Sequence, residues 1–362
     1  MKYQTHLTGA VEQLSYEGSR EFNNWFWTKL CELGVRVAEV LQDDLVALIL
    51  GGGYGRGQGA VSIETGLEMP YNDVDLFMVT KTPTPKHLEG LSKIAKEYEH
   101  MLQVSVDFSR PQTIKMIRNW PCVLMWQELA LGHKVLHGPR DVIDRNVNKS
   151  VRLRLPLIEA SRLLINRGAG LIWAERVIEG AEPAPDSTFV ARNYFKCALG
   201  IADAVLIARG QYSSDPQTKF QRMDILLARN DSFANRIDAL ELLQSGLAFR
   251  RAPGKPYGIS TQNCQLLAQT WMTTFLWVES QRLRKEFNSV QDYARWRGPR
   301  ESHKYGILGT IASNRKRGHW SWINPIDQVY RSLPGTMQSL QGNVQAFVQT
   351  SGATLDQWRT AQ

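Results

Sequence analysis

The order of apolar and polar positions near the start of the chain predicts alternating helices and strands. Residues 20–41 carry apolar side chains at spacings near three and four, which predicts an amphipathic helix. The unbroken apolar run LVALIL at 45–50 predicts a buried strand that ends at a group of glycines. A second strand is predicted at 73–80, a second helix at 86–101, and a strictly alternating third strand at 102–109. This order suits a sheet with helices on one face.

Beyond residue 150 the apolar period is helical and strand patterns are few. Long stretches with this period predict a helical bundle: 156–180, 193–210, 236–249 and 264–287. We therefore expect an α+β protein in which a small mixed β-sheet with helices is followed by a mostly helical domain. The expected domains are a sheet domain over 1–150, a helical bundle over 151–290, and a basic, aromatic-rich segment over 291–362.

The composition is that of an ordinary folded chain, and its charge favours anionic partners. The 362 residues are 43% hydrophobic and 22% charged, without a long biased tract. The net charge is +8, and the stretch 282–331, with eleven basic and four acidic residues, carries nearly all of it. Aromatic residues alternate with these cations: Tyr293, Trp296, Tyr305, Trp320 and Trp322. Such a segment either stacks the bases of a nucleic acid or is a solvated face with its aromatic rings packed inward.

Cysteine usage and hydropathy favour a cytoplasmic protein. The four cysteines are scattered, with no CxxC pair and no histidine at metal-binding spacing, which is typical of reduced thiols. The first residues lack the apolar core of a signal peptide, and no apolar run reaches the roughly 18 residues of a membrane span. We therefore expect cytoplasmic localisation and no membrane partner.

The glycine-rich stretch GGGYGRGQG, residues 51–59, directly follows the first predicted strand. Glycines allow the backbone itself to approach a large or negatively charged ligand such as a phosphate group. The stretch has neither the GxGxxG pattern of dinucleotide-binding proteins nor the GK[ST] of a P-loop, and no helix is predicted to begin at it. By itself, it indicates only that some phosphate is bound.

Asp73 and Asp75 lie two residues apart on the second predicted strand and therefore share one face. Neighbouring carboxylates on an otherwise apolar strand repel each other, and a divalent cation is the simplest compensation. Oxygen ligands of this kind suit Mg²⁺, which keeps positions open for substrate phosphates. Asp107, on the polar face of the third strand, completes the set if the two strands are neighbours. The alternative is that Asp73 caps the strand and that Asp75 is solvated.

The glycine-rich stretch, the segment NDVDLF at 72–77 and the strand that carries Asp107 together resemble the nucleotidyltransferase superfamily. This superfamily includes polymerase beta, the aminoglycoside and lincosamide nucleotidyltransferases, and the minimal nucleotidyltransferases of toxin–antitoxin loci. The resemblance covers residues 45–109 and implies a nucleotidyltransferase core in the sheet domain. It also implies an enzyme that moves an NMP from an NTP, with ATP expected, to an acceptor hydroxyl and releases pyrophosphate.

The resemblance further implies roles for single residues. Asp73, Asp75 and Asp107 match the carboxylates that bind two Mg²⁺ ions, with Mn²⁺ as the alternative metal. Asp107 would also help to deprotonate the acceptor hydroxyl. Gly52 and Gly53 match the glycine pair whose backbone meets the phosphates.

The chain departs from the superfamily pattern at two places. Gly53 stands where many members have a serine that binds phosphate, which leaves that contact to backbone N–H groups. The stretch 60–72 lengthens the gap between the glycines and Asp73, and we expect it to form an extended hairpin.

Three further residues are candidates for nucleotide binding. The stretch that contains Lys196 resembles a helix that follows the catalytic domain in several of these enzymes. This makes Lys196 a candidate for a phosphate contact and Tyr212 for a contact with the base, against the alternatives of a surface lysine and a packed tyrosine. Arg56 either touches phosphate or pins the glycine-rich stretch to a nearby carboxylate.

A metal-dependent nucleotidyltransferase is the expected function, and two others compete with it. The first is an inactive module that binds nucleotide or RNA, and the three aspartates speak against it. The second is a dinucleotide-binding oxidoreductase, which the missing GxGxxG pattern disfavours. The acceptor is left open among an RNA 3′ end, a protein hydroxyl and a small molecule, with the size of the helical domain and its basic segment favouring a macromolecule.

Overall fold

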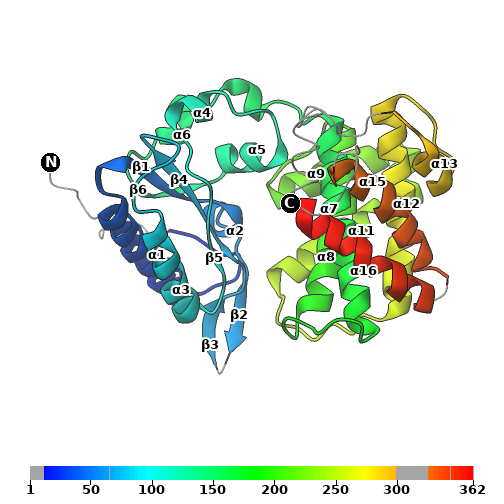
Figure 1. Ribbon diagram of the computed structural model, residues 1–362, viewed down its shortest axis with the longest axis horizontal. Helices are drawn as coiled ribbons and strands as arrows, with labels where there is room; N and C mark the ends of the chain where they lie inside the picture. Colours follow the sequence, from blue (N-terminus) through cyan, green and yellow to red (C-terminus); the bar gives the residue numbers. More distant parts are fainter. Residues whose placement is uncertain (1–11, 65, 299–324, 343, 362) are drawn as a thin grey trace. The chain divides into compact units, whose positions relative to one another are not determined.

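A computed structural model describes four stretches of the chain: 12–64, 66–298, 325–342 and 344–361. The chain divides into two compact units: Met1–Leu153 with Arg250–Lys255, and Arg154–Phe249 with Pro256–Gln362. Figure 1 shows that the first unit contains the β-strands and that the second is built from helices.

The first unit is built on a four-stranded mixed sheet. Its strand order is β5-β4-β1-β6, with these bounds: β1 Leu45–Leu50, β4 Val74–Thr80, β5 Val106–Phe108 and β6 Lys134–His137. β1 runs antiparallel to both β4 and β6, whereas β4 and β5 are parallel. The α+β class predicted from the sequence is therefore confirmed.

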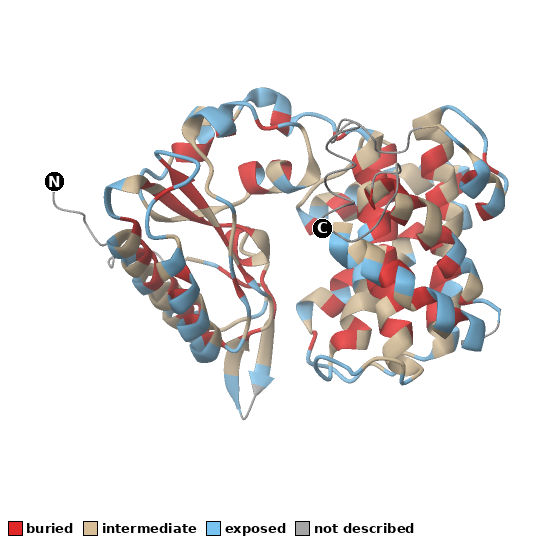
Figure 2. Ribbon diagram, viewed as in Figure 1, coloured by how far each residue is buried: buried red, intermediate tan, exposed pale blue. Residues whose placement is uncertain are grey.

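Two long helices, α1 (Arg20–Leu41) and α3 (Glu89–Leu102), cover one face of this sheet (Figure 1). α1 begins where the pattern predicts because the Ser19 side chain accepts a hydrogen bond from the Phe22 N–H. A 3₁₀ turn, η1 (Gln42–Asp44), joins α1 to β1. Every second residue at the start of β4 is buried against the helices: Val74, Leu76 and Met78. Figure 2 shows this buried layer in red along the strands.

Helices also cover the other face of the sheet, so the prediction of helices on one face is wrong. These elements are short: α4 Ile114–Arg118, α5 Leu124–Leu131, α6 Val142–Asn146 and the 3₁₀ turn η2 Lys149–Arg152. They form a second core cluster with Ile49 of β1 and Val79 of β4. Helices of five to eight residues make only one or two turns, which is too short for an apolar period to be visible in the sequence.

The stretch between the glycines and Asp73 forms the predicted hairpin. β2 (Val61–Glu64) and β3 (Leu67–Pro70) pair antiparallel as a separate two-stranded sheet. Gly66 takes a positive φ of 83° at the turn, which a glycine adopts without strain. The hairpin is linked to the start of α1, since the Ser19 N–H donates to the Glu68 carboxylate at 3.1 Å.

The glycine-rich stretch and the third strand differ from prediction. The stretch opens one turn of helix, α2 (Gly52–Gly55), where no helix was predicted. β5 is shorter than predicted because α3 continues to Leu102, where Gln103 ends it with a left-handed φ of 56°. Asp107 nevertheless lies within the strand, as the site prediction requires.

The second unit contains the predicted bundle of helices. The bounds are α7 Leu157–Ile178, α8 Phe189–Ala208, α9 Pro216–Ala228, α10 Ser232–Arg236, α11 Ala239–Arg251, α12 Thr261–Leu283, α13 Val290–Arg295, α15 Pro325–Ser339 and α16 Val344–Ala361. α7, α8 and α12 pack together, and Trp271 of α12 donates its indole N–H to the Leu164 carbonyl of α7 at 2.7 Å. In the described parts of the chain, no helix is both long and apolar enough to cross a membrane.

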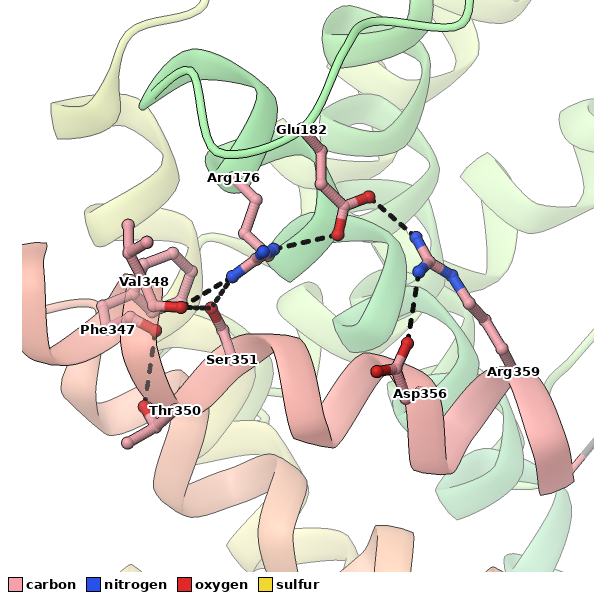
Figure 3. Close-up of polar contacts among 8 residues, drawn as sticks. All are labelled: Arg176, Glu182, Phe347, Val348, Thr350, Ser351, Asp356 and Arg359. Carbon is pink, nitrogen blue, oxygen red and sulfur yellow. Dashed lines mark hydrogen bonds and ion pairs between the residues drawn. The ribbon is translucent and has the colours of Figure 1, made fainter. Parts of the chain in front are cut away.

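The last helix, α16, is bound to α7 by charged groups (Figure 3). Arg176 of α7 donates to the Val348 carbonyl at 2.7 Å and to the Ser351 hydroxyl at 2.9 Å. The Glu182 carboxylate, in the loop after α7, accepts from Arg176 at 3.0 Å and from Arg359 of α16 at 2.8 Å. One acidic side chain therefore bridges two arginines on different helices.

Much of the basic, aromatic-rich segment lies outside the described residues. Tyr305, Trp320 and Trp322 fall in this part, so neither interpretation of them is tested. Tyr293, in contrast, is buried, and its hydroxyl donates to the Glu279 carboxylate at 2.7 Å. Trp296 packs its ring edge-on against Phe287, with 6.0 Å between centroids. For these two aromatic residues, the inward-packed alternative describes what is found.

Candidate functional site

The parallel pairing of β4 and β5 brings the aspartates to one edge of the sheet. Asp75 lies opposite Asp107 in the strand register, so the two strands are neighbours, as the site prediction requires. Asp73 directly precedes β4 and is exposed, as is Asp107. Because Val74 and Leu76 face α1 and α3, Asp73 and Asp75 lie on the opposite face of the strand.

The surroundings of Asp107 at this edge of the sheet shift the pKa of its carboxyl group. Partial burial raises its pKa, and the negative charges of Asp73 and Glu99 raise it further. Glu99, on α3, also accepts a hydrogen bond from the Val106 N–H at 3.2 Å. The carboxylates thus repel each other, which is the condition that a bound cation would relieve.

The glycine-rich stretch, called here the glycine loop (residues 51–59), lies directly against Asp75. The Gly51 N–H donates to the Asp75 carbonyl at 2.9 Å. Gly52 has a positive φ of 58°, and a Cβ at this position would lie 1.9 Å from the Asp75 carboxylate oxygen Oδ2. Only glycine therefore fits at position 52 without moving a predicted metal ligand.

Gly55 and Gly53 differ in whether their surroundings leave room for a side chain. A Cβ at Gly55 would lie 2.4 Å from the Leu50 carbonyl oxygen, so this position also needs glycine. At Gly53 the nearest atom to an added Cβ is Gly59 Cα at 3.5 Å, an ordinary van der Waals contact. Position 53, where many superfamily members have serine, thus has room for a side chain.

Arg56 is bound to a carboxylate of a neighbouring helix. Its guanidinium lies 3.2 Å from the Glu128 carboxylate of α5, and only 10% of the Arg56 side chain is exposed. Its Nε also donates to the Gln58 side chain at 3.4 Å. Of the two interpretations of Arg56, the observed pairing favours the one in which it pins the loop. Glu128 gave no signal in the sequence because it lies 72 residues away.

Lys196 and Tyr212 belong to the second unit. Lys196 is exposed on α8, as either interpretation of it requires. Tyr212 is half-buried, with the Lys219 ammonium 4.8 Å from its ring centroid. Lys219 is itself buried and pairs with Asp203 at 2.7 Å. The packed-tyrosine alternative thus describes the surroundings of Tyr212.

The fit of a metal ion can be judged from the donor chemistry of the site. Among the residues that the structure describes, no group of three or more His, Cys, Asp or Glu side chains is gathered closely enough to hold a metal ion. The backbone nevertheless places Asp73, Asp75 and Asp107 together, and their donors are oxygens only. Oxygen donors under mutual repulsion suit Mg²⁺ or Mn²⁺. The residues present therefore fit a hard divalent cation in their chemistry.

A family comparison covers this part of the chain. Residues 62–127 match the family model of the nucleotidyltransferase domain. The first unit carries a nucleotidyltransferase domain. The match confirms the resemblance seen in the sequence; it begins after the glycine loop and includes all three aspartates. No curated protein matches the chain at a significant level.

The nucleotidyltransferase domain supports nucleotidyl transfer as the general function and a nucleoside triphosphate as the substrate. Domains of this family typically use divalent metals, which agrees with the donor chemistry at the sheet edge. The GxGxxG pattern of an oxidoreductase is missing, and the helix that follows β1 is a single turn over Gly52–Gly55.

Proposed function

We propose that the chain is a divalent-metal-dependent enzyme that transfers an NMP from an NTP, with ATP expected, to an acceptor hydroxyl. The observation that carries the proposal is the juxtaposition of Asp75 and Asp107, which lie within the nucleotidyltransferase match, with Gly52 of the glycine loop that precedes the match. Carboxylates that bind metal and a loop that meets phosphate are needed side by side for this chemistry.

The residues of the site have distinct roles in the proposed reaction, and Asp107 has two. Asp73, Asp75 and Asp107 would hold the cation, with Mg²⁺ expected, which when bound neutralises charge on the triphosphate. The backbone at Gly52 and Gly53 would lie against the phosphates. Asp107, whose pKa is raised by burial and by its acidic neighbours, would accept the acceptor's proton.

The bond changes are those of an in-line displacement. The acceptor oxygen forms a bond to the α-phosphorus as the bond from that phosphorus to the bridging oxygen breaks, and pyrophosphate leaves. The acceptor's proton passes to the Asp107 carboxylate. The basic residues of 282–331 favour a macromolecular, anionic acceptor over a small molecule.

Labelled NTPs test this proposal. The full chain is incubated with each α-labelled NTP, Mg²⁺ and cell extract, and pyrophosphate and labelled species are measured. We expect transfer that EDTA abolishes and that Asp75→Asn or Asp107→Asn lowers by about 10² or more. Asp43→Asn, an exposed aspartate of the same unit, is the matched control and should leave the rate unchanged.

The outcomes separate the proposal from its competitor. Binding of NTP by the wild-type chain without transfer to any acceptor would identify an inactive nucleotide-binding module. A rate that Asp75→Asn leaves equal to that of Asp43→Asn would contradict the metal-site assignment. Replacement of Mg²⁺ by Mn²⁺ in the same assay shows which cation supports the reaction.

A further inference from the structure

A buried tyrosine within the glycine loop is bound to the residues that precede Asp73. Tyr54 lies in α2 and is 1% exposed. Its hydroxyl accepts hydrogen bonds from the Tyr71 N–H at 2.9 Å and the Asn72 N–H at 3.1 Å, and it donates to the Ala60 carbonyl at 2.8 Å. A hydroxyl has one donor and two acceptor sites, and all three are used here.

The side chain of Asn72 adds a further hydrogen bond to Ala60. Its side-chain oxygen accepts from the Ala60 N–H at 2.7 Å. Both backbone groups of Ala60 are therefore bound by side chains, one from Tyr54 and one from Asn72. Ala60 is the first residue after the glycine loop, and Asn72 is the last before Asp73. We call Tyr54, Ala60 and Asn72 the loop clamp.

The ring of Tyr54 is held as firmly as its hydroxyl. It packs edge-on against Phe26 of α1, with 4.8 Å between centroids. On the opposite end of the loop, a Cβ at Gly59 would lie 2.0 Å from the Tyr54 ring. Because the ring cannot shift, the hydroxyl stays at a fixed place relative to the backbone of the loop.

We propose that Tyr54 is a positioning residue whose hydroxyl sets the place of the glycine loop relative to Asp73. This inference rests on the proposed nucleotidyl transfer. In that reaction the phosphates lie on the loop while the metal lies on the aspartates, so both parts must be aligned at once. Misplacement of one part by about 1 Å can cost about 10² in rate. A phenylalanine would fill the same space in the core, but only the tyrosine hydroxyl binds the backbone of residues 71 and 72.

Removal of the hydroxyl alone tests the role of Tyr54. In Tyr54→Phe the ring packing is kept, and we expect kcat to fall by about tenfold to 10² with the KM for ATP changed less than about threefold. Hydrogen exchange should become faster at the amide of Asn72, which loses the Tyr54 hydroxyl as its acceptor, whereas the Tyr71 N–H keeps a second acceptor, the Ala60 carbonyl at 3.2 Å. The matched control is Tyr98→Phe, a tyrosine of α3 that is 2% exposed and packs in the same core cluster. It should change none of these quantities.

A second variant changes Asn72, the other side chain of the loop clamp. Asn72→Ala removes the acceptor of the Ala60 N–H and leaves the Tyr54 hydroxyl in place. We expect kcat to fall about tenfold with little change in KM. If Tyr54→Phe does not fold, this variant alone decides, because a kcat equal to that of Tyr98→Phe would then overturn the proposal.

The readouts distinguish failure of this inference from failure of the proposed function. A wild-type chain without transfer activity contradicts the function, and hydrogen exchange then decides the role of Tyr54 by itself. Unchanged exchange at the Asn72 amide in Tyr54→Phe overturns the inference. In an active enzyme, a kcat within about twofold of the Tyr98→Phe control also overturns it.

Discussion

At the scale of single residues, the glycines of the glycine loop differ in whether their surroundings require a glycine. Gly52 borders the Asp75 carboxylate and has a positive φ, and Gly55 borders a carbonyl oxygen of β1. At Gly53 an added Cβ would make only ordinary van der Waals contacts, the nearest at 3.5 Å from Gly59 Cα. The first two positions are therefore constrained to glycine by close contacts, whereas the third has room for a Cβ.

Because of this difference, we expect alanine substitutions at positions 52 and 53 to have different effects on activity. Gly52→Ala places a methyl group where Asp75 Oδ2 lies and forces a left-handed backbone on alanine, which costs about 1 to 2 kcal/mol. We expect kcat/KM to fall by about 10² because the carboxylate is displaced. Gly53→Ala is the matched control and should stay within about threefold of wild type.

Thermal unfolding and steady-state kinetics of both variants check the prediction. Equal activity of the two variants would contradict the placement of Asp75 against the loop. Gly53→Ser is a further test of position 53, since it introduces the residue that many superfamily members carry. With room for the side chain at 3.5 Å from Gly59 Cα, we expect this variant to remain active.

At the scale of elements, local patterns predicted the long helices and the core strands well. α1 covers Arg20–Leu41 as predicted, because the Ser19 cap and a long apolar stripe both lie within the segment itself. β1 covers Leu45–Leu50 for the same kind of reason. The short helices α4 to α6 were missed because each has too few residues for a period. β5 was predicted too long because the alternation of apolar residues continues through the end of α3.

The docking of α16 depends on an ionised carboxylate and therefore on pH. Burial opposes ionisation of Glu182, but hydrogen bonds from Arg359 and Arg176 outweigh it and lower its pKa below the ordinary 4.5. A lowered pKa in the folded state adds stability above the unfolded pKa, and this stability is lost as the pH falls through the folded pKa. The contribution of Glu182 is thus complete at neutral pH and disappears in acid.

Glu182→Gln tests whether the ionised Glu182 carboxylate stabilises the docking of α16. At pH 7 we expect the variant to lose about 1 kcal/mol in free energy of unfolding, since Glu182 is 19% exposed and its bonds are only partly screened. The gap between wild type and variant should close as the pH falls below 4.5 and through the lowered pKa of Glu182, which urea unfolding at several pH values measures. Asp356→Asn, whose carboxylate also pairs with Arg359 but is 74% exposed, is the control and should change little. A gap that is independent of pH would contradict the role of the ionised form.

At the scale of the whole molecule, the chain combines a nucleotidyltransferase domain with a second, helical unit that the family match does not cover. The sequence resemblance assigns one residue of this unit, Lys196, to the triphosphate. Its side chain is exposed on α8, so replacement should leave the fold intact. The proposal for Lys196 can therefore be tested by kinetics without loss of structure.

We expect Lys196→Gln to raise the KM for ATP about tenfold with kcat nearly unchanged, because a charge-assisted phosphate contact is worth about 1.4 kcal/mol or more. Steady-state kinetics with varied ATP provides the measurement. Arg229→Gln, at the exposed end of α9 in the same unit, is the matched control. A KM equal to that of the control would assign Lys196 to the surface alone.

The sequence by itself determined the elements and the chemistry that each one carries. The helix at 20–41, the strand at 45–50 and the shared face of Asp73 and Asp75 all follow from periods that repeat within a few residues, and the hairpin within 60–72 was expected from the lengthened gap between the glycines and Asp73. The resemblance carried by the glycines and aspartates then implied nucleotidyl transfer. These features are local, so they can be seen without knowing how the chain folds back on itself.

Only the tertiary structure decided which of these groups meet. Asp75 lies opposite Asp107 because β4 and β5 pair in parallel at that register. Arg56 binds Glu128 across 72 residues, and Tyr54 binds the backbone of Tyr71 across 17. No local period encodes a strand register or a contact between distant residues, because both are set by how whole elements pack. For this reason the aspartates could be found in the sequence, whereas the clamp that aligns the glycine loop with them could not.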